Sequence, residues 1–148
     1  MPTATLVDDH LLLRGLVGHL PPGVVRGRTM TTTGWWWRAV APLASPPSPV
    51  VGRHRSFAAA LGVDSDGVLL DALAAVGQPG STVAIHELVP LLPAMARLAR
   101  DEHLNRLHAE AVVVALVHGA RVRVRRGNAG RLPEVAERFD IDFATVDL

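Results

Sequence analysis

Two adjacent carboxylates and an imidazole directly follow the first apolar run of the chain. Residues 3–7 have the β-branched and apolar character of a short strand, which ends in Asp8, Asp9 and His10 before a helical apolar pattern begins. Ligands of open α/β sheets bind outside the carboxyl ends of strands, so these side chains lie where a site is expected. Adjacent carboxylates repel unless they are solvated, paired with a cation or bound to a metal. Alternatively, one of them caps the helix, because Asp is a preferred N-cap residue.

Three consecutive tryptophans, Trp35 to Trp37, precede Arg38. Residues of a helix advance by about 100° each, so the three indoles span about 200° and cannot all face one core. Two of them are expected to anchor the core. The alternative is that an exposed indole, for which Trp36 is the candidate, stacks on a nucleic-acid base beside Arg38.

The charge of the chain is unevenly distributed, although the formal net charge is only +1. Residues 10–63 contain six arginines, including Arg53 and Arg55, and no Asp or Glu. A basic half of this kind attracts phosphate polymers, which makes Arg38, Arg53 and Arg55 candidates for RNA binding. It is equally able to pair with the more acidic remainder of the chain across the fold, and the sequence leaves both possibilities open.

Length and composition predict one domain over residues 1–148. Hydrophobic residues make up 49% of the chain, which is enough to fill a core, and there is no cysteine. We find no apolar run long enough for a transmembrane helix and no pattern typical of a signal peptide. These features predict no membrane association and are compatible with a cytoplasmic protein.

The order of elements predicts an α/β fold with three α/β/α layers around a mainly parallel central sheet. Strands are expected at 3–7, 81–85, 121–125 and 142–146, and the stretch 24–33 is either a strand or a loop. The expected helices cover residues 11–20, 34–43, 56–61, 68–76, 88–100, 106–118 and 132–139.

Three stretches resemble PIN-domain proteins. Residues 5–8 with the helix after them are similar to the opening of that family, and residues 107–122 are similar to its later helix–Gly–Ala–strand unit. The Thr-Gly-Trp-Trp-Trp-Arg segment at 33–38 resembles an actinobacterial PIN-like subgroup. The resemblance implies a PIN-like α/β/α domain and a divalent-metal-dependent endoribonuclease, often the toxin of a toxin–antitoxin pair.

The resemblance also implies a set of site residues. Asp8 matches the metal-binding acid of the first strand, and Glu110 matches the acid near the start of the later helix. Glu87 is a weaker third ligand, Asn128 stands where a fourth carboxylate is expected, and Asp9 partly compensates for it. Mg²⁺ or Mn²⁺ would bind these oxygen donors, with Asp8, Asp9 and Glu110 as the catalytic residues.

The chain departs from the family pattern in its acids. No Asp or Glu lies between positions 10 and 63, where such nucleases carry their second acid, and Asn128 is neutral. The alternative is therefore a catalytically inactive PIN-like module that binds RNA or protein. The expected partners are RNA, an antitoxin protein and a second copy of the chain. The same acid-free stretch argues against a phospho-accepting receiver domain, and Asp8-Asp9-His10 does not supply the Asp-x-Asp of a dehalogenase-type phosphatase.

Overall fold

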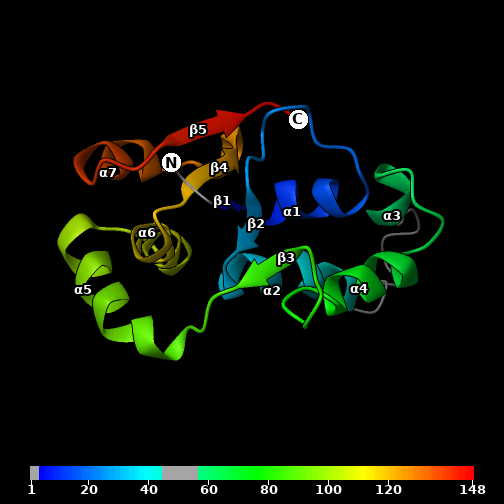
Figure 1. The fold of residues 1–148 in the computed structure, drawn as a ribbon, viewed down its shortest axis with the longest axis horizontal. Coiled ribbons are helices and arrows are strands. Elements are labelled where there is room, and N and C mark those ends of the chain that lie inside the picture. Colours follow the sequence, from blue (N-terminus) through cyan, green and yellow to red (C-terminus); the bar gives the residue numbers. More distant parts are fainter. Residues whose placement is uncertain (1–3, 45–56) are drawn as a thin grey trace, which may run out of the picture.

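The centre of the structure is a five-stranded parallel sheet with the strand order β3-β2-β1-β4-β5. The structure is a computed structural model that describes residues 4–44 and 57–148. It confirms the predicted α/β class with a parallel central sheet (Figure 1). The strands are β1 (Ala4–Val7), β2 (Arg28–Thr31), β3 (Val83–Ile85), β4 (Arg121–Arg125) and β5 (Phe143–Val146).

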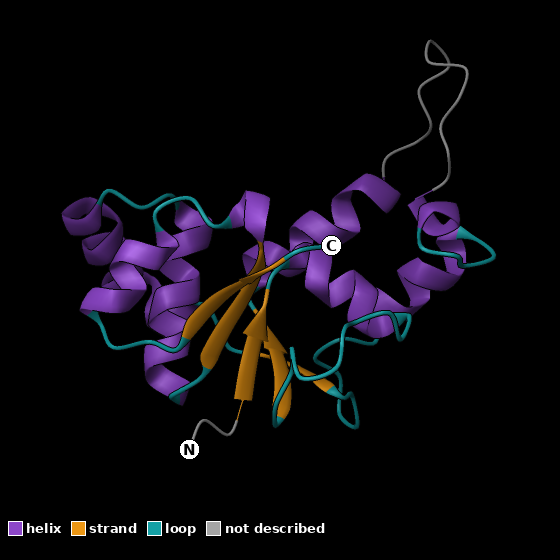
Figure 2. Ribbon diagram, turned by 90° about the horizontal axis from the view of Figure 1, so that it is seen from above, coloured by secondary structure: helices purple, strands orange, loops and turns teal. Residues whose placement is uncertain are grey.

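Helices cover both faces of this sheet, which gives the three predicted layers (Figure 2). One face packs against α5, α6 and α7, and the other packs against α1, α2 and α4. The helical elements are α1 (Asp9–Leu16), α2 (Thr33–Ala44), α3 (Phe57–Ala60), α4 (Asp66–Ala74), η1 (Val89–Leu91), α5 (Leu92–Glu102), α6 (Arg106–His118), η2 (Arg126–Asn128) and α7 (Leu132–Arg138). No helix within these described residues is long and apolar enough to cross a bilayer.

The central strand β1 is buried on both faces. Leu6 belongs to the core under α5–α7, and its neighbour Val7 belongs to the core under α1, α2 and α4. A parallel strand covered by helices on both sides has no solvent face, which explains why all four residues of β1 are buried. Its β-branched residues also suit the pleated backbone.

The direction of strand order reverses between β1 and β4. From β1 the chain proceeds outward through β2 to β3, and it then returns to the other side of β1 to form β4 and β5. Such a reversal opens a crevice at the carboxyl ends of the two adjacent strands, and α/β proteins bind their ligands there. Asp8 follows β1 at this edge, and Arg125 ends β4 beside it.

Several boundaries differ from the predicted ones, and each difference has a local cause. The ambiguous stretch 24–33 contains the strand β2, which is held between β1 and β3. The predicted helix 88–100 divides into η1 and α5, because Pro90 and Pro93 lack the backbone N–H that a continuous helix needs. The first helix ends at Leu16, and Gly18 then takes a left-handed conformation with φ of 75°.

Candidate functional site

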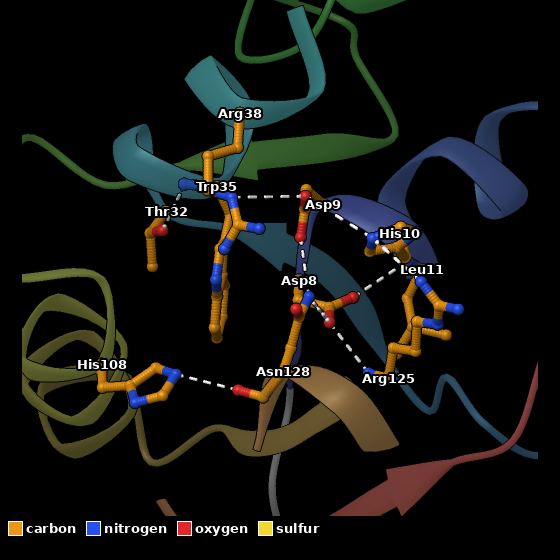
Figure 3. Close-up of polar contacts among 10 residues, drawn as sticks. All are labelled: Asp8, Asp9, His10, Leu11, Thr32, Trp35, Arg38, His108, Arg125 and Asn128. Atoms are coloured by element: carbon orange, nitrogen blue, oxygen red, sulfur yellow. Dashed lines mark hydrogen bonds and ion pairs between the residues drawn. The ribbon is translucent and has the colours of Figure 1, made fainter. Parts of the chain in front are cut away.

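Asp8 is fully buried where the strand order reverses between β1 and β4, which we call the switch point of the sheet. Its carboxylate accepts three hydrogen bonds. Its Oδ1 accepts from the backbone N–H of Leu11 at 2.9 Å, which makes it the N-cap of α1. Its Oδ2 accepts from the backbone N–H of Arg125 at 2.8 Å and from Nδ2 of Asn128 at 2.7 Å (Figure 3). Burial raises the pKa of this carboxyl above its ordinary value, while the hydrogen bonds oppose that shift.

Asp9 shares the same amide group. Nδ2 of Asn128 donates to Oδ1 of Asp9 at 3.0 Å, so one amide nitrogen bridges the two carboxylates (Figure 3). On its other side, Oδ2 of Asp9 lies 3.6 Å from Nε of Arg38 and 4.0 Å from Nε2 of His10. We call Asp8, Asp9 and Asn128 the acidic pair with its bridging amide. The structure thus brings together three of the predicted site residues.

A buried histidine that sequence reasoning missed positions the bridging amide. Asn128 ends η2, and Nε2 of His108 on α6 lies 2.9 Å from its backbone carbonyl oxygen. Because a carbonyl oxygen can only accept, Nε2 of His108 donates this hydrogen bond, and burial lowers the pKa of the ring. The contact joins residues 20 positions apart and exists only after α6 and β4 have packed. No local sequence pattern indicates it.

Glu110 lies against a different element, the N-terminus of α2. Its Oε1 accepts from the backbone N–H of Gly34 at 3.2 Å, and the carboxyl is almost completely buried. A carboxylate is favourable at this position because the helix dipole is positive there. Gly34 is needed for the contact: a Cβ at this position would lie 2.6 Å from Cδ2 of Leu107 and 3.1 Å from Oε2 of Glu110.

Burial raises the pKa of Glu110 above its ordinary value of 4.5, and the Gly34 hydrogen bond opposes the shift. A raised pKa in the folded state means that the folded chain binds this proton more tightly than the unfolded chain. The stability contributed by the protonated carboxyl is therefore complete below pH 4.5 and is lost as pH rises through the raised pKa.

We expect Glu110→Gln to be more stable than the wild type at pH 8, by about 1 kcal/mol, because the buried amide does not carry the charge that burial penalises. The glutamine keeps an oxygen that accepts from Gly34 and carries no charge. Urea unfolding of both proteins between pH 4 and pH 8 measures the effect, and the difference should shrink toward acid pH. A difference that does not vary with pH would contradict this assignment of the titrating group.

The other predicted ligands lie apart from the acidic pair. Glu87 is exposed and follows β3, the edge strand two places from β1. Within residues 4–44 and 57–148, no group of three or more His, Asp or Glu side chains is arranged to hold a metal ion. Arg53 and Arg55, predicted to bind RNA, lie outside the described residues.

The three tryptophans divide between core and surface. Trp35 is fully buried, and Trp36 is half-buried and donates its Nε1 hydrogen to the carbonyl of Leu73 at 2.9 Å. Trp37 is 64% exposed and is therefore the most accessible of the three indoles, whereas the sequence predicts Trp36 for stacking. The span of about 200° over the three indoles predicts that at least one is exposed. Which one it is depends on how α2 is rotated against the sheet.

A cavity of about 420 Å³ opens beside the exposed indole. It lies where the N-terminal turns of α2 and α6 meet, and two arginines, Arg38 and Arg106, stand at its wall. Both arginines are exposed, and Arg38 also faces Asp9. The cavity is lined by Thr33, Gly34, Trp36, Trp37, Arg38, Arg106 and Leu107, and we call it the indole–arginine cavity.

A further arginine borders the acidic pair on the opposite side. Arg121 and Arg123 of β4 form ion pairs with Asp142, and these hydrogen bonds and charges hold the pKa of Asp142 below its ordinary value. Arg125 is the last arginine of the strand, and its Nη1 lies 3.3 Å from Nε2 of His10. Exposed cations therefore flank the carboxylates on both sides of the switch point.

The arrangement does not suit a resident Mg²⁺ or Mn²⁺ of the PIN type. Such an ion needs unoccupied carboxylate lone pairs. Asp8 already uses three of its about four acceptor positions for N–H donors, and the bridging amide turns hydrogens toward both carboxylates. Glu110 is bonded to α2 through Oε1, while its buried Oε2 has no hydrogen-bond partner among the described residues. The groups that face the two carboxylates are N–H donors and the guanidinium of Arg38, and these compete with a metal ion for the same oxygens.

A scan against models of protein families found no match, and a search of curated proteins found no significant match. The function must therefore be argued from the geometry of the site.

Proposed function

We propose that the chain is an RNA-binding protein of PIN-like architecture that holds single-stranded RNA at the carboxyl edge of its sheet. The observation that carries the proposal is the indole–arginine cavity, in which the exposed Trp37 stands with Arg38 and Arg106. Aromatic faces stack on unpaired bases, and guanidinium groups bind the phosphates between them. A cavity of about 420 Å³ is large enough to accept one base.

The charge around the cavity supports a strand that continues across the switch point. Arg38 lies between the cavity and the acidic pair, and Arg125 lies beyond the pair at the end of β4. The carboxylates of Asp8 and Asp9 are buried, whereas the arginines along this edge are exposed, so the edge presents mainly cationic groups to a ligand. Single-stranded RNA fits better than a duplex, since its bases are free to stack.

We expect Trp37→Ala to weaken binding of a single-stranded RNA oligonucleotide by about 5- to 100-fold, the loss of one base–aromatic stack. Fluorescence anisotropy of a labelled 12-mer, recorded in EDTA, measures the affinity. Val89→Ala is the control, because Val89 is a 75% exposed apolar residue that does not line the indole–arginine cavity, and its truncation should leave the affinity unchanged. Equal binding by the wild type and Trp37→Ala would refute the proposed interface.

The arginines give a second readout in the same assay. Replacing Arg106 by alanine should reduce the slope of log affinity against log salt by about 0.7, the value for one phosphate contact to a single strand. Arg97→Ala is a control of equal charge, since Arg97 is an exposed residue of α5 that bonds only to the carbonyl of Pro93 among the described residues. It should leave the slope near that of the wild type.

A second candidate is the divalent-metal-dependent endoribonuclease that the PIN resemblance implies. One observation favours it: the carboxylates of Asp8 and Asp9 meet at the topological switch point. Mg²⁺ or Mn²⁺ would first have to displace the amide of Asn128. Incubation of RNA with the protein in Mn²⁺ or in EDTA separates the two functions. Metal-dependent cleavage that disappears in Asp9→Asn would establish the nuclease.

The nuclease candidate also carries its own expectations about partners. A toxin would bind an antitoxin protein, and the exposed Leu116 and Val117 of α6 offer apolar surface for a homodimer. Light scattering after size-exclusion chromatography tests the dimer. We propose a cytoplasmic location for either function, because RNA is found there.

A further inference from the structure

We infer that the Asn128 amide takes the place that a divalent cation would hold between Asp8 and Asp9, and that this single residue keeps the site free of metal. The inference does not depend on RNA binding. It rests on the contacts around the acidic pair, and it predicts that Asn128→Asp creates a cation site at this edge of the sheet.

The first step is the bridging geometry. One nitrogen, Nδ2 of Asn128, lies 2.7 Å from Oδ2 of Asp8 and 3.0 Å from Oδ1 of Asp9. An amide NH₂ has two hydrogens and directs one to each acceptor. It thereby relieves the repulsion between two buried carboxylates, which is the task of a shared cation in an acidic site. The amide does this without introducing a full charge.

The second step is that the amide is held in place. The backbone carbonyl of Asn128 accepts a hydrogen bond from His108, and the ring of His108 packs against Gly130. A Cβ at Gly130 would lie only 2.8 Å from Cε1 of His108, and this glycine has φ of 49°, a conformation that side chains disfavour. The segment after β4 is thus shaped to present residue 128 to the carboxylates.

The third step is that the remaining acceptors are also occupied. Asp8 accepts two further backbone N–H groups, from Leu11 and Arg125, and Asp9 faces Arg38 at 3.6 Å. The acceptor positions left to a cation are therefore those on Oδ2 of Asp8 and Oδ1 of Asp9 that the Asn128 amide now occupies. Aspartate at position 128 would replace the two amide hydrogens that face Asp8 and Asp9 with a carboxylate oxygen. Three carboxylates would then surround one point. Hard divalent cations such as Mn²⁺ and Mg²⁺ prefer such oxygen donors.

The test is thermal unfolding and calorimetric titration with MnCl₂. In EDTA, Asn128→Asp should unfold at a lower temperature than the wild type, because three carboxylates then repel one another. Mn²⁺ should raise its Tm by about 5 °C or more at a concentration a hundred times the Kd, and should leave the wild type unchanged. The control is Asn105→Asp, an identical chemical change at the exposed N-cap of α6, where Asp serves as well as Asn.

Several results would overturn the inference. One is saturable binding of Mn²⁺ to the wild type that is lost in Asp8→Asn. Another is an Asn128→Asp variant that folds and shows no response to Mn²⁺. If this variant fails to fold, Asn128→Ala provides the readout: it removes the bridging hydrogens without adding charge, and Mn²⁺ should then stabilise it measurably. Absence of that stabilisation would reject the inference. Anisotropy with RNA in EDTA remains a separate measurement, so failure of RNA binding does not affect this result.

Discussion

Asp8→Ala is expected to lower the free energy of unfolding by about 3–5 kcal/mol, a large share of the stability of a small domain. The substitution leaves three N–H groups without their acceptor: the backbone of Leu11 and Arg125, and the amide of Asn128. A buried donor without a partner costs about 1–3 kcal/mol. The charge of Asp8 is itself costly to bury, as its raised pKa shows, and this reduces the net loss. Urea unfolding at pH 7 measures the difference.

Two controls separate this network from a general loss of charge. Asp101→Ala removes an exposed partner of Arg100 and should change stability by less than about 1 kcal/mol. Asp8→Asn keeps an oxygen for Leu11 but places an NH₂ against the backbone N–H of Arg125, so it should cost an intermediate amount. If Asp8→Ala proved no more costly than Asp101→Ala, Asp8 would not hold α1 and β4 together.

The local sequence pattern predicts much of the secondary structure. The helix Arg106–His118 agrees with the prediction at both ends, because Asn105 caps its start and Gly119 ends it with φ of 58°. The strand Arg121–Arg125 likewise matches its alternating sequence. The strand Arg28–Thr31 was ambiguous because its four residues form a strand through pairing with β1 and β3, and such pairing is a tertiary property.

The candidate site was predictable only where the chain itself places residues together. Asp8 and Asp9 are adjacent and follow a strand, and the N-cap role considered for one of them is confirmed for Asp8. The direction in which Glu110 points depends on the packing of α6 against α2, 76 residues away, so spacing could not assign it to α2. Likewise, His108 and Asn128 meet only because η2 follows β4 beneath α6.

The second large effect is expected at Trp35, the residue that fixes α2 to the core. Trp35 is completely buried, and its backbone N–H donates to Oγ1 of Thr32, the cap of this helix. Trp35→Ala should cost about 3–5 kcal/mol, because it removes a large buried side chain and leaves a cavity. Urea unfolding monitored by circular dichroism measures the loss.

Two further substitutions test whether the stability lost in Trp35→Ala comes from the burial of its side chain. Trp37→Ala deletes an identical side chain from a 64% exposed position and should cost less than about 1 kcal/mol, although it is the variant expected to weaken RNA binding. Trp35→Phe keeps most of the buried area and removes an Nε1 hydrogen that has no acceptor in the described structure, so it should fall well below Trp35→Ala. A cost for Trp37→Ala equal to that of Trp35→Ala would mean that α2 is rotated differently against the sheet. The indole–arginine cavity would then have no exposed stacking surface. The order of these three costs therefore tests the orientation of the helix that presents Trp37 and Arg38 together.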